Sequence, residues 1–138
     1  MRTVYVDTGA FIALLWQRDA AHHHAREHLL RLRRERARLV TSDAVIAETC
    51  TRLRYDAGLP RTLAFRDFLQ EAADSAALTI RESDAGLRQS AFELMARYHG
   101  LTLSYADCVG AAVAREVSAA AVFGLDNDFR VMGLNVEP

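Results

Sequence analysis

Thr3-Val4-Tyr5-Val6-Asp7-Thr8, near the amino terminus, indicates how the whole chain is built. Its first half consists of β-branched and aromatic residues without polar alternation, which is typical of a strand covered on both faces. The run ends in the carboxylate of Asp7, and Thr8 is then expected to cap a helix over the apolar residues 10–15. A buried strand followed at once by a helix is typical of a βαβ unit, in which parallel strands alternate with helices.

The rest of the chain continues this alternation. Further strands are expected at 39–41, 77–80 and 119–123, with a last edge strand within 131–136. Helices are expected from Asp19 to about Arg38, over 44–56 after a cap at Ser42 or Asp43, over 61–73, from a cap at Ser83 or Asp84 to about His99, and over 108–117. The pattern predicts a three-layer α/β/α sandwich with a central, mostly parallel sheet, formed by one domain over residues 1–138.

Composition narrows the class of protein. The chain has 138 residues, of which 51% are hydrophobic, enough for one folded core. It has no apolar run as long as a membrane span and no signal-peptide pattern, so a cytoplasmic protein is expected. Cys50 and Cys108 lie in apolar helical segments and fit buried thiols better than a disulfide framework or a zinc site. The net charge of −1 gives by itself no sign of nucleic-acid binding.

One basic segment remains open to two interpretations. All 17 basic residues of the chain are Arg, and five of them stand close together at Arg31, Arg33, Arg34, Arg36 and Arg38. They form either a solvated face or an electrostatic platform for RNA phosphates or an acidic partner segment. In the same expected helix, His22, His23, His24 and His28 could in principle bind a metal ion. No HExxH pattern or Cys accompanies them, so a solvated polar helix start is favoured.

Four acidic residues are candidates for a catalytic site, and each also has a plain structural interpretation. Asp7 and Asp126 follow expected strands, where a helix cap or a polar turn would also explain them. Asp107 ends the run Ser104-Tyr105-Ala106-Asp107, which resembles a capping box, but the following helix is small and apolar and is expected to be buried. Glu48 lies on the same flank of its helix as Arg52, so an inward carboxylate and a surface salt bridge both fit.

A divalent metal ion would explain why these acids occur together. In open parallel sheets the ligand site lies at the carboxyl ends of the strands, so Asp7 and Asp126 are expected at one edge, near Glu48 and Asp107. Crowded carboxylates raise one another's pKa, and Mg²⁺ or Mn²⁺ removes that penalty. A bound water could then attack a phosphodiester. The chain has no GxxxxGK[ST], GxGxxG or GxSxG motif, which leaves nucleotide-fuelled, dinucleotide and serine-hydrolase chemistry without support.

The ordered set of motifs resembles the PIN-domain nucleases and, within that family, the VapC-type toxins of bacterial toxin–antitoxin systems. The matching pieces are Val4-Tyr5-Val6-Asp7-Thr8, Glu48 after Thr41-Ser42-Asp43, Ser104-Tyr105-Ala106-Asp107 and Leu125-Asp126-Asn127-Asp128-Phe129. The resemblance implies a metal-dependent endoribonuclease whose acidic metal-site residues are Asp7, Glu48, Asp107 and Asp126. It also implies a secondary acid at Asp128 and polar supports at Thr8 and Ser104.

The same resemblance implies partners. These are an RNA substrate, a second copy of the chain in a homodimer, and a small antitoxin whose tail enters the acidic site, commonly placing an Arg there. One departure is Gly124-Leu125, where the family usually has Thr or Ser before the fourth acid. Two other functions remain open: a PIN-like nuclease that processes RNA or acts on DNA and is no toxin, and a catalytically silent binding module that uses the basic residues at 31–38.

Overall fold

The computed structural model describes residues 1–138 and contains five strands, β1 (Thr3–Val6), β2 (Arg38–Ser42), β3 (Leu78–Arg81), β4 (Ala121–Phe123) and β5 (Val136–Glu137). They pair in the order β3-β2-β1-β4-β5, and every pairing is parallel. The central strand β1 is buried over residues 4–6, as its unbroken apolar run predicts. The expected parallel sheet is confirmed.

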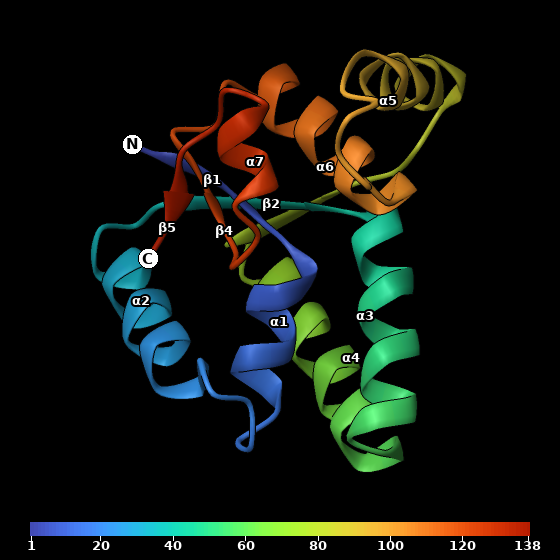
Figure 1. Cartoon of the computed structure of the whole chain (residues 1–138). Helices are drawn as coiled ribbons and strands as arrows, with labels where there is room; N and C mark the ends of the chain where they lie inside the picture. Colours follow the sequence, from blue (N-terminus) through green and yellow to red (C-terminus); the bar gives the residue numbers. More distant parts are fainter.

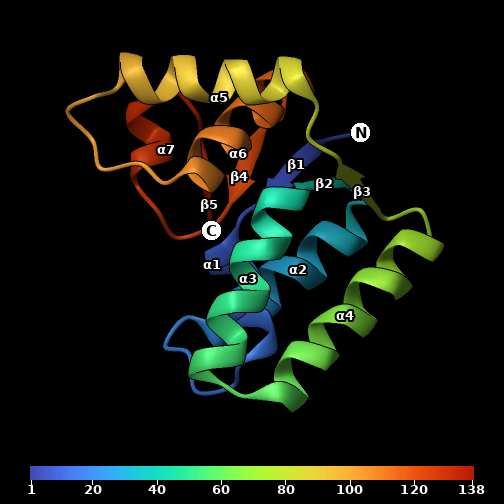
Figure 2. The same cartoon turned by 90° about the vertical axis from the view of Figure 1, so that its right-hand side faces the viewer.

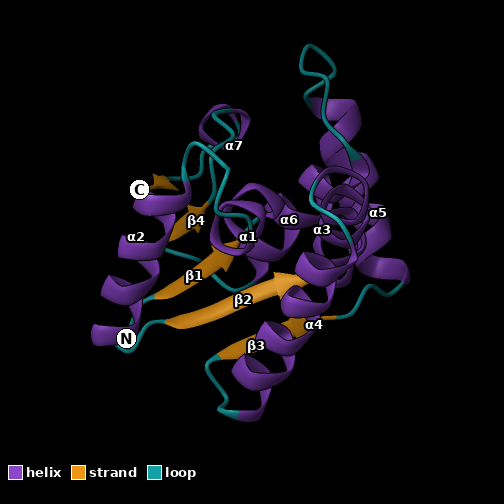
Figure 3. Cartoon of the chain, turned by 90° about the horizontal axis from the view of Figure 1, so that it is seen from below, coloured by secondary structure: helices purple, strands orange, loops and turns teal.

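Seven helices accompany the sheet, α1 (Thr8–Leu15), α2 (His22–Arg34), α3 (Asp43–Asp56), α4 (Leu59–Asp74), α5 (Ala85–Arg97), α6 (Tyr105–Glu116) and α7 (Asp128–Val131). Figure 1 and Figure 2 show α1 to α4 on one face of the sheet and α5 to α7 on the other. The arrows of β1 and β2 run in the same direction between these layers (Figure 3). The predicted three-layer α/β/α architecture is thus confirmed. No helix combines the length and the apolar character needed to cross a membrane.

The packing of α6 on β1 requires a position without a side chain. Tyr5 of β1 is fully buried, and its hydroxyl oxygen lies 2.9 Å from Ser42 Oγ at the end of β2. A Cβ atom at Gly110 of α6 would lie 2.9 Å from Tyr5 Cε1 and 3.0 Å from the hydroxyl oxygen. The helix can therefore approach the strand this closely only because residue 110 is Gly.

Ser42 joins this packing to the start of α3. Its Oγ accepts a hydrogen bond from the backbone N–H of Val45 (3.2 Å), which makes Ser42 rather than Asp43 the N-cap. We expect Ser42→Ala to lower the free energy of unfolding by about 1–2 kcal/mol, because it removes the cap and leaves the buried Tyr5 hydroxyl without its partner. Urea unfolding followed by tryptophan fluorescence measures the loss. Ser90→Ala, at an exposed position of α5, is the control, and an equally small loss in both variants would contradict this account.

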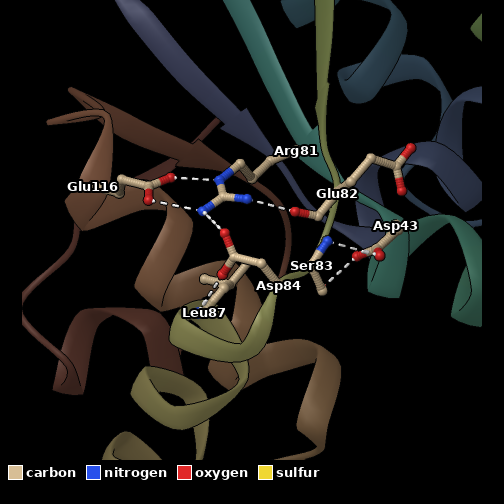
Figure 4. A network of polar contacts seen from close by, with 7 residues as sticks. All are labelled: Asp43, Arg81, Glu82, Ser83, Asp84, Leu87 and Glu116. Atoms are coloured by element: carbon tan, nitrogen blue, oxygen red, sulfur yellow. Dashed lines mark hydrogen bonds and ion pairs between the residues drawn. The ribbon is translucent and has the colours of Figure 1, made fainter.

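Polar contacts at the end of β3 join both helix layers (Figure 4). Arg81 donates from Nε to Glu116 Oε2 of α6 (2.8 Å), and from Nη2 to Glu116 Oε1 (3.1 Å) and Asp84 Oδ2 (3.3 Å). The contact with Arg81 lowers the pKa of Glu116. Asp43, the first residue of α3, accepts from the backbone N–H (2.9 Å) and the hydroxyl (2.7 Å) of Ser83. The network fixes the β3–α5 connection, although its exposure keeps its contribution to stability small.

The predicted extent of the basic helix is wrong. α2 ends at Arg34 instead of near Arg38. Arg36 adopts a left-handed backbone conformation with φ 55°, and Arg38 already belongs to β2, where it pairs with Thr3 of β1. Strand pairing overrides the helix propensity of the Arg-rich run.

Two smaller expectations also need correction. Thr8 does not cap α1: Asp7 occupies the N-cap position without a side-chain capping bond, and the helix begins at Thr8. The last edge strand is shorter than predicted, because Val131 ends α7 and Gly133 turns the chain with φ 85°. Only two residues, Val136 and Glu137, then pair with β4.

Candidate active site

An open cleft of about 360 Å³ lies at the carboxyl ends of β1 and β4. β1 pairs with β2 on one side and with β4 on the other, so this is the point where the order of the strands reverses. Open parallel sheets bind ligands at such a switch point. The residues that line the cleft are Asp7, Thr8, Gly9, Glu48, Arg52, Thr102, Ser104, Asp107, Leu125 and Asp126. The fold thus brings together all four candidate carboxylates and both expected polar supports.

Asp7 is the buried member of the four carboxylates, with 5% of its surface exposed. Its Oδ1 has no hydrogen-bond partner. Burial raises the pKa of Asp7 to about 7, against the opposing effect of the backbone N–H of Thr8. The negative charges of Asp107, Glu48 and Asp126 raise this pKa further. A buried carboxylate with one unpartnered oxygen, surrounded by other carboxylates, has the environment in which a bound cation stabilises it most.

Glu48 is held in the cleft by Thr8. Thr8 Oγ1 donates a hydrogen bond to Glu48 Oε2 over 2.8 Å and so joins the first turn of α1 to α3. Arg52, one turn further along α3, forms no ion pair with Glu48 or with any other acid. The choice that the sequence left open is therefore decided by geometry: Glu48 is an inward carboxylate and not half of a surface salt bridge.

Asp107 combines a capping role with a place in the cleft. Ser104 Oγ accepts from the backbone N–H of Asp107 (3.0 Å), and Asp107 Oδ2 accepts from the backbone N–H of Ser104 (2.9 Å), which completes the expected capping box. Burial raises the pKa of Asp107, the backbone N–H and the hydroxyl of Ser104 oppose the rise, and the charges of Asp126 and Glu48 add to it. Since the cap uses only Oδ2, the structural and the functional interpretation do not exclude each other.

The turn after β4 separates two acids that stand close together in the sequence. Asp126 lines the cleft, and its Oδ1 accepts from the backbone N–H of Asp128 (2.9 Å). Asp128 begins α7 and is not among the lining residues. Gly124 belongs to the Gly124-Leu125 pair at which the chain departs from the Thr or Ser usual in the family. It lies against Asp7, and a Cβ atom at residue 124 would be 3.1 Å from Asp7 Cβ. The small residue lets the end of β4 pass close beside the buried carboxylate.

The available donors suit a hard divalent cation. All of them are carboxylate oxygens, which Mg²⁺ and Mn²⁺ prefer. Glu48, Asp107 and Asp126 each use one oxygen in a hydrogen bond within the chain, so their second oxygens are available, as is the buried Oδ1 of Asp7. No three of these side chains converge into a ready-made ligand group.

The basic segment lies away from this cleft. Arg38 begins β2 at its amino end, whereas the carboxylates gather at the carboxyl ends of the strands. Arg33, Arg36 and Arg38 instead line a separate, mostly apolar groove of about 580 Å³ beside α2 and α4. The contact with RNA or a partner expected of the basic residues stays a prediction, and it concerns a surface distinct from the acidic cleft.

The histidine run forms no metal-binding group. His22 Nδ1 lies 2.6 Å from a carbonyl oxygen of α1, and His23 Nε2 lies 3.2 Å from Glu27 Oε1. His24 is exposed, whereas His28, one turn further along α2, is buried. The favoured interpretation as a solvated polar helix start fits the exposed His23 and His24, but it is wrong for His28, which is buried with 3% exposure.

Four residues of the cleft were not predicted as site residues. Gly9 lies in the first turn of α1, and Thr102 and Leu125 lie in connections whose position depends on the folded sheet, so nothing local marks these three residues. Arg52 had one signal, its spacing of four residues from Glu48, which places both side chains on one flank of α3.

The fold and the acidic cleft at its switch point define the class of protein, and comparison with known proteins agrees. A family model described as the PIN domain matches residues 4–134. The chain therefore belongs to the PIN-domain family. No curated protein matches it.

Two solved structures are similar to nearly the whole chain. VapC20 of Mycobacterium tuberculosis, described as a sarcin–ricin-loop-cleaving toxin, has a TM-score of 0.82 and 26% identity over 95% of both chains. VapBC2 from Rickettsia felis, bound to a DNA fragment from its promoter, has a TM-score of 0.68 and 17% identity over 98% of this chain and 97% of that chain. The second likeness concerns the fold alone. Together with the family, these structures confirm the resemblance to PIN-domain proteins of the VapC type.

Proposed function

We propose that the chain is a Mg²⁺- or Mn²⁺-dependent endoribonuclease, the toxin of a toxin–antitoxin pair, with residues 1–138 forming one nuclease domain. The observation that carries this proposal is the buried carboxylate of Asp7, whose Oδ1 has no hydrogen-bond partner, at the switch point of the sheet in a cleft also lined by Glu48, Asp107 and Asp126. Membership of the PIN-domain family and similarity to a sarcin–ricin-loop-cleaving toxin support it.

In this proposal the four carboxylates share the task of holding the cation. The cation, when bound, supplies positive charge at the phosphate and activates a water for attack on phosphorus. Asp7 would be the central ligand, since it is the buried member of the four, and its backbone N–H, which donates to the Phe123 carbonyl (2.9 Å), fixes it between β1 and β4. Glu48 and Asp107 reach the cleft from the two helix layers, and Asp126 from the end of β4.

The polar neighbours act as positioning residues and do not take part in the chemistry themselves. Thr8 orients Glu48, and Ser104 orients Asp107, each through hydrogen bonds that leave one carboxylate oxygen available. Asp128 contributes through its backbone N–H, which fixes the carboxylate of Asp126. Such outer contacts hold metal-binding side chains in place.

The proposed partners follow from the same resemblance. The toxin would act on RNA in the cytoplasm as a homodimer and would be inhibited by a small antitoxin. The cleft offers four carboxylates to the antitoxin's tail, so a tail that carries an Arg would bind there in a charge-assisted contact.

RNA cleavage by the purified protein in Mg²⁺, Mn²⁺ or EDTA tests this function. The wild-type protein is expected to cleave with either cation and not in EDTA. Asp107→Asn is expected to lower the rate at least about 100-fold, because it removes a metal-binding oxygen while keeping the shape of the side chain. Asp56→Asn, at the exposed end of α3, is the matched control and should retain the wild-type rate. Cleavage in EDTA, or full activity of Asp107→Asn, would contradict the assigned mechanism.

The toxin role has its own test. Growth arrest on expression, relieved by a small DNA-binding protein encoded in the neighbouring reading frame, would support it. Metal-dependent cleavage without growth arrest would instead point to a PIN-like nuclease that is no toxin. RNA binding that is salt-dependent, needs no cation and leads to no cleavage would point to a silent binding module.

A further inference from the structure

We propose that Arg52 binds a phosphate of the RNA strand and holds it beside the carboxylates; the inference deepens the nuclease function proposed above. Arg52 is the only basic residue that lines the acidic cleft. Its side chain is exposed on α3, one turn beyond Glu48. The cleft therefore contains a single guanidinium at its rim, on the same wall as one of its carboxylates.

The guanidinium is not used by the chain itself. Residues four apart on a helix commonly form ion pairs, so Glu48 would be the natural partner of Arg52. Glu48 instead accepts a hydrogen bond from Thr8 (2.8 Å), and no ion pair or side-chain hydrogen bond of the chain involves Arg52. Elsewhere on the surface Arg81 binds two acids at once. Arg52 thus keeps its full set of N–H donors for a ligand.

The charge of the cleft explains why such a residue is needed. A phosphodiester is an anion, and four carboxylates repel it. One divalent cation offsets only part of their negative charge. A planar guanidinium reduces the remaining repulsion and can bind two phosphate oxygens in parallel, which an ammonium group cannot do. The clustered arginines Arg33, Arg36 and Arg38 cannot serve this purpose, because they line the groove at the amino end of β2.

Arg54 provides a matched control on the same helix. It is exposed like Arg52 and likewise has no ion pair. It does not line the cleft, because two residues along a helix turn the side chain to another face. The two arginines therefore differ in position relative to the carboxylates and in little else.

Steady-state cleavage of single-stranded RNA tests the assignment. Arg52→Ala is expected to raise KM about tenfold or more with a smaller change in kcat, as loss of a charge-assisted contact implies. The slope of log KM against log salt concentration should fall by about 0.7, the value for one phosphate contact on a single strand. Arg52→Lys should recover only part of the affinity, because Lys keeps the positive charge but lacks the planar guanidinium that binds two phosphate oxygens. Arg54→Ala should leave both quantities at their wild-type values.

Two results would overturn the inference. One is the same KM and the same salt slope for Arg52→Ala and Arg54→Ala. The other is a loss of kcat in Arg52→Ala at unchanged KM and salt slope, which would mean that Arg52 does not hold the RNA strand. Thermal unfolding should be alike in the two variants, because neither side chain makes an ion pair or hydrogen bond within the chain.

Binding separates this inference from the nuclease function. Fluorescence anisotropy of an end-labelled single-stranded RNA in EDTA and low salt measures affinity without cleavage. Weaker binding by Arg52→Ala than by Arg54→Ala supports the phosphate contact even if no cation supports cleavage, in which case only the nuclease proposal fails. Equal binding by the two variants, or no binding by the wild-type protein, overturns the contact even if cleavage is metal-dependent.

Discussion

Asp7→Asn is expected to abolish metal-dependent RNA cleavage and, at the same time, to make the metal-free protein more stable at pH 8. The first effect follows from loss of the central ligand of the proposed cation, and we expect a decrease in rate of at least about 100-fold. The second follows from burial. Asn is neutral and nearly the same shape as Asp, so it removes an uncompensated negative charge from a position with 5% exposure.

The pH dependence of the stability effect has a definite sign. Burial first, and then the charges of the three other carboxylates, raise the pKa of Asp7 from 3.8 to about 7. Because the pKa of Asp7 is higher in the folded state than in the unfolded state, protonated Asp7 contributes to the free energy of unfolding. This contribution is fully present below pH 3.8 and is lost as the pH rises through 7. At pH 8 the free energy of unfolding of the wild-type protein is therefore expected to be on the order of 3–4 kcal/mol lower than that of Asp7→Asn.

Urea unfolding in EDTA at pH 5 and pH 8, followed by tryptophan fluorescence, measures this difference. The gain in Asp7→Asn should be large at pH 8 and much smaller at pH 5, and saturating Mn²⁺ should reduce it by stabilising only the wild-type protein. The exposed control Asp56→Asn should show no such dependence on pH. A gain that is the same at both pH values would mean that the carboxylate of Asp7 is not the cause.

Gly110→Ala is expected to lower both stability and activity. The added methyl group would lie 2.9 Å from the ring of the fully buried Tyr5, so α6 must move away from β1. Overpacking of this kind costs about 1–3 kcal/mol, partly offset by the higher helix propensity of Ala. Asp107 lies one turn earlier on α6, and Asp7 directly follows β1, two residues after Tyr5, so the same shift separates two of the proposed metal-binding residues. We therefore expect about tenfold lower cleavage as well.

A second helical glycine gives the control. Gly86, in the first turn of α5, is exposed, and a Cβ atom there would make only an ordinary contact of 3.5 Å with Asp84 Oδ1. Gly86→Ala should stabilise the protein by up to about 1 kcal/mol through helix propensity and leave cleavage unchanged. If the two substitutions had the same effect on stability and on cleavage, the close packing of α6 on β1 would not be what positions Asp107.

The alternation of strands and helices could be predicted because local patterns and tertiary packing agree. The apolar run at 4–6 is buried on β1, and the small apolar helix after Asp107 is buried in the domain, as their composition predicts. The helix through Arg38 could not be corrected from sequence, since nothing local stops a run of Arg and Ala. Its end is set by the pairing of Arg38 with Thr3, a contact between distant parts of the chain.

The sequence predicted the acids of the candidate site, the polar supports Thr8 and Ser104 and the capping box at Asp107, but not the bond from Thr8 to Glu48. Asp7 and Asp126 follow strands, which marks them directly. Glu48 was ambiguous, because its orientation depends on Thr8, forty residues earlier, and periodicity cannot detect such a bond. For the same reason the sequence left open whether Arg52 pairs with Glu48. That Arg52 has no ion pair could be recognised only from the structure, in which Glu48 accepts a hydrogen bond from Thr8 instead.

Binding of Mn²⁺ to the purified protein, measured by the loss of the free-ion signal in electron paramagnetic resonance, tests most directly whether the four carboxylates form a cation site. We predict that the wild-type protein binds Mn²⁺ and that Mg²⁺ displaces it. Asp7→Asn should bind at least about tenfold more weakly, while Asp56→Asn binds like the wild-type protein. Equal affinity of the wild-type protein and Asp7→Asn for Mn²⁺ would contradict the central claim.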